Sequence, residues 1–105
     1  PLTDLREAGE FLQKYEQRFG AKIQNYGPYT YDVANILLTA ISRVIERNGR
    51  PDKAAILEEV KKIQHDGVIG RTSFDENGDT ENKIITLYRV EQAHFVPFKT
   101  LTLSK

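Results

Sequence analysis

Cysteine is absent from the 105-residue sequence, and charge of neither sign is in excess. The lack of cysteine excludes disulfides, thiolate nucleophiles and cysteine-ligated zinc sites. Fifteen basic residues balance fifteen acidic ones, so no overall field attracts nucleic acid or an anionic membrane surface. We therefore expect no nucleic-acid partner.

Long apolar runs are also missing. No segment approaches the roughly 18 to 20 consecutive apolar residues that a membrane-spanning helix needs. The sequence opens on PLTDLRE rather than on a basic and then apolar signal sequence, so we expect any targeting signal to lie outside it. The 39% of hydrophobic residues can bury one small core.

Motifs for catalysis, metal binding or phosphate binding are not found. None of the three serines lies in a GxSxG elbow, and no glycine-rich loop follows a predicted strand. His65 and His94 are outside HExxH spacing, and the adjacent pair His65-Asp66 is expected to point apart. The acidic run from Asp75 to Asp79 starts like an EF-hand loop, but its later positions lack the required glycine and glutamate. We expect no enzyme activity, no metal and no cofactor.

Three helices are predicted from apolar residues that recur at steps of three and four. The first covers Phe11 to Phe19, with Asp4 and Glu7 as a capping box upstream. The second covers Val33 to Ile45 and has the strongest pattern. The third begins near Pro51 or Asp52, where proline suits the first turn, and its apolar stripe ends at Ile63.

After Ile63 the pattern changes from helical to alternating. This change predicts strands at Val68 to Phe74, Ile84 to Val90 and Phe95 to Phe98, separated by turns at Asn77-Gly78 and Glu91 to His94. Pro97 cannot donate to a ladder, so the last strand is expected to lie at an edge or to end there. The tail from Leu101 to Lys105 has no pattern.

The aromatic cluster from Tyr26 to Tyr31 is the strongest candidate for a binding role. It is predicted to form a loop before the long helix, where free N–H groups favour a carboxylate or another polar group. Tyr26 or Tyr29 would close over an apolar side chain of the ligand. The alternative is that the tyrosines only brace the loop against the helices, and we expect packing roles for Tyr15 and Tyr31.

Two stretches of the sequence, in the same order, carry a resemblance to a known family. They are FLQKYEQRFG followed by YTYDVANILLTAI, and the later GVIGRTSFDENGDTENKIITLYRVEQAHFVPF. Together they resemble the C-terminal end of type I periplasmic substrate-binding proteins, in the branched-chain amino-acid ABC transporter receptor family. The resemblance runs from about Phe11 to Phe98 and reaches only the final portion of a much longer protein. The chain is therefore expected to be a fragment.

The resemblance implies an α/β fold, a fragment of the two-lobed periplasmic-binding-protein type I fold, with three helices followed by a short antiparallel β segment. In such proteins the ligand binds between two lobes that close about a hinge. Residues 1–80 would be the helices and first strand of one lobe. Residues 81–105 would be the strand and hairpin after the third interlobe crossing, in the other lobe.

The resemblance also implies a function. The whole protein would capture branched-chain or related amino acids in the periplasm, or outside a Gram-positive cell on a lipid anchor, and deliver them to the membrane permease of an ABC importer. Tyr26 matches the aromatic residue that faces the cleft and touches the ligand, and Tyr29 lies nearer the helix. The other ligand contacts of the family lie upstream of this sequence. A free-standing α+β interaction module is the alternative, and the isolated fragment is expected to self-associate through uncovered surfaces.

Overall fold

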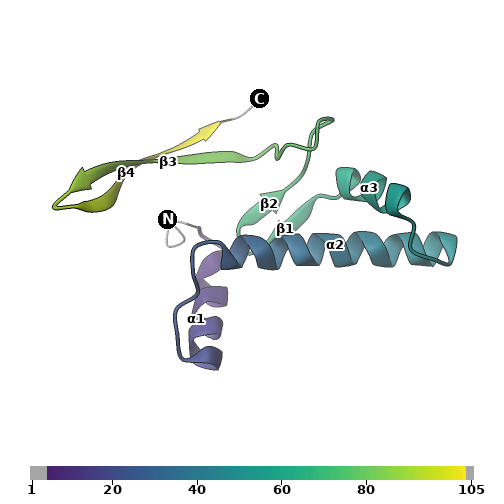
Figure 1. Cartoon of the computed structure of the whole chain (residues 1–105), viewed down its shortest axis with the longest axis horizontal. Helices are drawn as coiled ribbons and strands as arrows, with labels where there is room; N and C mark the ends of the chain where they lie inside the picture. Colours follow the sequence, from purple (N-terminus) through teal and green to yellow (C-terminus); the bar gives the residue numbers. More distant parts are fainter. Residues whose placement is uncertain (1–4, 104–105) are drawn as a thin grey trace.

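A computed structural model describes residues 5–103 as three helices followed by four strands (Figure 1). All three predicted helices are confirmed, and the strands after them are antiparallel. The elements are α1 (Ala8–Phe19), α2 (Gly27–Asn48), α3 (Lys53–Lys62), β1 (His65–Gly67), β2 (Gly70–Thr72), β3 (Lys83–Glu91) and β4 (His94–Leu103). None of the helices in the described residues is long and apolar enough to cross a membrane.

Helix α2 begins earlier than the sequence predicts. Its first residue is Gly27, so most of the tyrosine cluster forms the first turn of the helix, and the predicted loop is wrong. Pro28 explains the early start, because a proline in the first turn has the backbone torsion of a helix and needs no N–H partner. The capping box predicted for α1 includes Asp4, which lies outside the described residues; Glu7 is the N-cap residue of α1 and makes no side-chain cap bond.

The core lies between α2 and α3. Ile36, Ala40 and Ile63 are buried together, and Ile56, Val60 and Phe74 pack against them. Val44 on the same face of α2 is also fully buried. All of these positions except Phe74 lie on the apolar stripes expected from the sequence.

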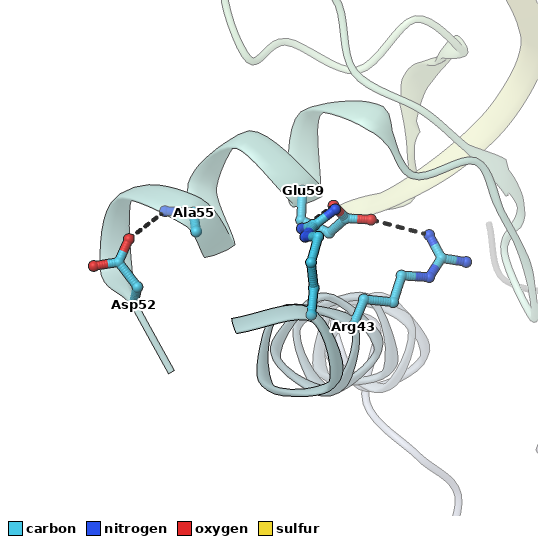
Figure 2. Close-up of polar contacts among 5 residues, drawn as sticks. Arg43, Asp52, Ala55 and Glu59 are labelled. Carbon is cyan, nitrogen blue, oxygen red and sulfur yellow. Dashed lines mark hydrogen bonds and ion pairs between the residues drawn. The ribbon is translucent and has the colours of Figure 1, made fainter. Parts of the chain in front are cut away.

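Polar contacts cap α3 and join it to α2 (Figure 2). Asp52 caps α3 by accepting a hydrogen bond from the Ala55 N–H at 2.9 Å. Glu59, which is almost buried, accepts from Arg47 at 2.9 Å and from Arg43 at 3.5 Å, both on α2. The Arg47 hydrogen bond is the main reason that the pKa of Glu59 lies below its ordinary value.

The strand predicted from Val68 to Phe74 is confirmed only at Gly70–Thr72, which forms β2, and its first two residues do not belong to a strand. The chain instead forms a tight hairpin in which β1 pairs with β2, with Val68 and Ile69 as the two turn residues. Gly70, with a φ of 98°, takes up the left-handed backbone that closes the turn. The turn at Asn77-Gly78 is confirmed, because Gly78 has a φ of 85° and its N–H donates to the Asp75 carbonyl at 3.1 Å.

β3 and β4 form a second, longer hairpin, and β4 extends to Leu103, into a tail for which no pattern is found in the sequence. Lys83 pairs with Leu103 at one end, and Glu91 pairs with His94 at the other. Gln92 and Ala93 form the two-residue turn with φ values of 47° and 63°. This is the backbone of a hairpin turn that asparagine and glycine ordinarily occupy. The predicted turn position is thus confirmed.

The molecule is elongated. Its radius of gyration is 16.7 Å, with extents of 56 × 37 × 21 Å, whereas a compact domain of about 100 residues has a radius near 13 Å. In Figure 1 the β3–β4 hairpin reaches away from the helices, and α1 lies across one end of α2. Most side chains of the hairpin are exposed, Phe95 to 80%.

Candidate ligand-binding surface at the start of α2

The two tyrosines selected from the sequence lie one helical turn apart at the start of α2. Tyr26 is the N-cap residue, and its carbonyl accepts hydrogen bonds from the Thr30 N–H and hydroxyl, both at 3.0 Å. Its side chain is 83% exposed and therefore does not brace the helices. Tyr31 has the packing role that was expected, because its ring lies 4.7 Å from that of Phe11.

Tyr29 lies beside an apolar groove that Tyr26 does not line. Helix α2 contributes Val33 and Ile36, and the segments that follow β1 contribute Phe74 and Ile84. Arg71 and Lys83 bring positive charge and Asp32 brings negative charge to a lining whose surface is otherwise mainly apolar. The cavity volume is about 350 Å³, within the range of small-molecule sites.

The main polar residue of this region, Asp32, was not found from the sequence. It is 1% exposed, and its two carboxylate oxygens accept the Val68 N–H at 3.0 Å and the Ile69 N–H at 2.9 Å. A Cβ atom at Gly67 would collide with this carboxylate, so only glycine fits there. Asp32 therefore ties the first turns of α2 to the β1–β2 turn. One signal was available: Asp32 stands four residues before Ile36 on the apolar face of the helix.

His65 and Asp66 point apart, as expected for neighbours in a strand. The His65 Nε2 lies 3.8 Å from the Asp32 Oδ1, whereas Asp66 faces Arg71 across the hairpin. The Arg71 guanidinium donates to Asp66 at 2.9 Å and holds the pKa of that carboxyl below its usual range. The pair has no shared target and does not form an acid-base couple.

Residues 5–103 contain no group of three or more histidine and acidic side chains that could hold a metal ion. In the acidic loop, one Asp75 oxygen accepts the N–H groups of Asn77 and Asp79, each at 2.9 Å. The acidic loop is thus a turn in which the Asp75 carboxylate accepts hydrogen bonds from the backbone.

No protein-family model and no curated protein matches the chain. Among solved structures, it is similar to a leucine-binding protein from Thermotoga maritima MSB8, with a TM-score of 0.70 and 26% sequence identity. The match covers 96% of this chain and 28% of that protein. The chain therefore has the fold of one part of a periplasmic binding protein, and it spans little more than a quarter of the length of the protein it matches.

Proposed function

We propose that this chain is the C-terminal part of an ABC-transporter solute-binding protein that captures branched-chain or related amino acids for import. The observation that carries the proposal is the match in fold over 96% of the chain to a leucine-binding protein. The whole protein would act in the periplasm, or outside the cell on a lipid anchor, and would deliver its ligand to a membrane permease. Its role is binding, without catalysis.

The hairpin geometry supports a division of the chain between two lobes. β3 and β4 form a sheet of their own, separate from β1 and β2. We assign residues 1–80 to one lobe and residues 81–105 to the other, with the crossing near Asp79 to Ile85. Motion about such a crossing would open and close the cleft around the ligand.

Tyr26 and Tyr29 are the proposed ligand-binding residues. The exposed ring of Tyr26 stands at the positive end of the α2 dipole, where a polar ligand group is favoured and the ring offers an apolar surface. Tyr29 extends the same aromatic surface toward the groove. The ring of Tyr26 would cover the ligand's side chain.

A chimera tests the proposal directly. This chain would replace the matching part of the Thermotoga maritima protein, and calorimetry would measure the binding of leucine, isoleucine and valine. The expected result is binding of at least one of them, weakened about 5-fold to 150-fold by Tyr26→Ala, which corresponds to a loss of about 1 to 3 kcal/mol of apolar contact. Phe19→Ala, which truncates an exposed ring of α1, is the matched control. A folded chimera that binds no amino acid would refute the proposal and favour a free-standing interaction module.

A further inference from the structure

The two edges of the β3–β4 hairpin differ in their capacity to pair. On β4, Pro97 lacks an N–H. Phe98 is an extra residue in β4: its neighbours Pro97 and Lys99 pair with Tyr88 and Leu87 of β3, and Phe98 itself has no partner, which makes a β-bulge. Both features block the addition of a further strand. β3 has neither: its nine residues, KIITLYRVE, contain no proline or glycine, and in the described part of the chain β4 is its sole partner. The outer edge of β3 is therefore open.

We propose that this open edge binds β3 of a second copy of the chain, antiparallel, about a two-fold axis at Leu87. The result is a symmetric dimer with a four-stranded sheet in the order β4, β3, β3, β4. A two-fold arrangement uses the same surface on both copies and closes after two. The inference concerns the 105-residue chain by itself and does not rest on the proposed function.

Charge fixes the register of the pairing. With Leu87 on the axis, Lys83 lies opposite Glu91 of the partner subunit, and symmetry repeats this pair at the other end of the strand. Sliding the strands by two residues in one direction places Lys83 opposite Arg89 of the partner subunit, and like charges directly opposite are destabilising. Sliding by two in the other direction moves Lys83 beyond Glu91 and leaves both charges without a cross-strand partner. A slide by one residue is excluded because the backbone N–H and C=O groups on the two facing edges would then no longer lie opposite each other.

Apolar side chains support the same register. Ile84 lies opposite Val90 of the partner subunit, and Leu87 lies opposite its own copy. All three side chains are exposed on the single chain, Val90 to 67%. Aliphatic and β-branched cross-strand pairs are among those that stabilise sheets. The ion pair between Arg89 and Glu91, at 2.7 Å, leaves Glu91 about half exposed and available to a second cation.

The absence of cysteine allows a direct test of the axis. Leu87→Cys places one thiol on each copy at the two-fold axis, where opposed Cα atoms are about 4.5 to 5.5 Å apart, within reach of a disulfide. Ile84→Cys is the matched control, because its two copies would be six strand positions apart, roughly 20 Å. Mild oxidation should convert most of the Leu87→Cys protein, and little of the Ile84→Cys protein, to a covalent dimer. Equal cross-linking of the two variants, or none of Leu87→Cys, overturns the proposed register.

Charge reversal tests the same pairing without touching the axis. In sedimentation velocity over a concentration series, Lys83→Glu or Glu91→Lys alone should weaken dimerisation about tenfold, since each replaces two attractions with two repulsions. The combination of Lys83→Glu and Glu91→Lys should restore it, whereas Glu76→Lys in the exposed loop should leave it unchanged. A chain that stays monomeric at about 200 μM, or a double variant that is no tighter than the single ones, refutes the proposal.

Discussion

Replacement of Asp32 should separate the β1–β2 hairpin from α2 at a large cost in stability. Asp32→Ala removes both acceptors and strands the Val68 and Ile69 N–H groups in a half-buried turn. Each unsatisfied buried donor costs about 1 to 3 kcal/mol. Because the turn retains partial access to water, we expect a loss of about 2 to 4 kcal/mol in the free energy of unfolding. Small domains have about 5 to 15 kcal/mol in total, so this loss is a large share.

The conservative variant sharpens the test. Asp32→Asn keeps the shape and one acceptor, but its amide nitrogen faces a backbone N–H, so its cost should be about half that of Asp32→Ala. Glu46→Gln, which makes the same chemical change at an exposed position of α2, is the control and should lie within about 0.5 kcal/mol of the unmodified chain. Urea denaturation followed by circular dichroism measures all three. An Asp32→Ala protein as stable as the Glu46→Gln protein would show that these hydrogen bonds do not hold the hairpin.

Three further predictions concern the turn, acid stability and the ligand. Ala93→Gly should raise the free energy of unfolding by about 0.5 to 1 kcal/mol in denaturation, because glycine adopts the left-handed backbone at φ 63° without strain. Ala34→Gly within α2 should lower the free energy of unfolding instead. Equal effects of the two substitutions would show that the backbone at Ala93 is not strained. The pKa of Glu59 is lowered by Arg47, so its contribution to stability is complete above the ordinary glutamate pKa and is lost as pH falls through the lowered value of the folded state. Thermal melts between about pH 6 and about pH 3 should therefore show a smaller loss for Arg47→Ala than for the unmodified chain, and parallel curves would exclude the linkage. The isolated chain should give no thermal shift with leucine, isoleucine or valine at millimolar concentration, where binding is worth about 4 kcal/mol; a micromolar ligand would mean that it holds a complete site.

The helices could be predicted because their buried faces repeat along the local sequence. The stripe from Ile36 to Val44 gives the position of α2 and most of the core without any knowledge of its partner. The start of the same helix was missed because glycine, proline and tyrosine are also typical of loops. Only the first-turn role of Pro28 distinguishes the two outcomes.

The short hairpin could not be predicted from local pattern. Val68 and Ile69 read as strand residues, and they become turn residues because a carboxylate 36 and 37 positions earlier accepts their N–H groups. Likewise, β4 continues to Leu103 because β3 offers a partner as far as Lys83. The assignment of Tyr26 and Tyr29 to a ligand stays a prediction. A contact with a ligand depends on every group that surrounds the ligand, and no local sequence pattern shows which groups those are.

The small core between α2 and α3 has a consequence for how the chain opens. Its buried side chains come from neighbouring elements, whereas β3 (Lys83–Glu91) and β4 (His94–Leu103) contain no buried residue. Free energies of local opening follow such differences in buried contacts. Amide hydrogens of α2 around Ala40 should exchange with solvent most slowly, and those near Phe95 should exchange early. The chain thus combines a helical unit that opens cooperatively with a β3–β4 hairpin whose stability depends on the strand or surface that it pairs with.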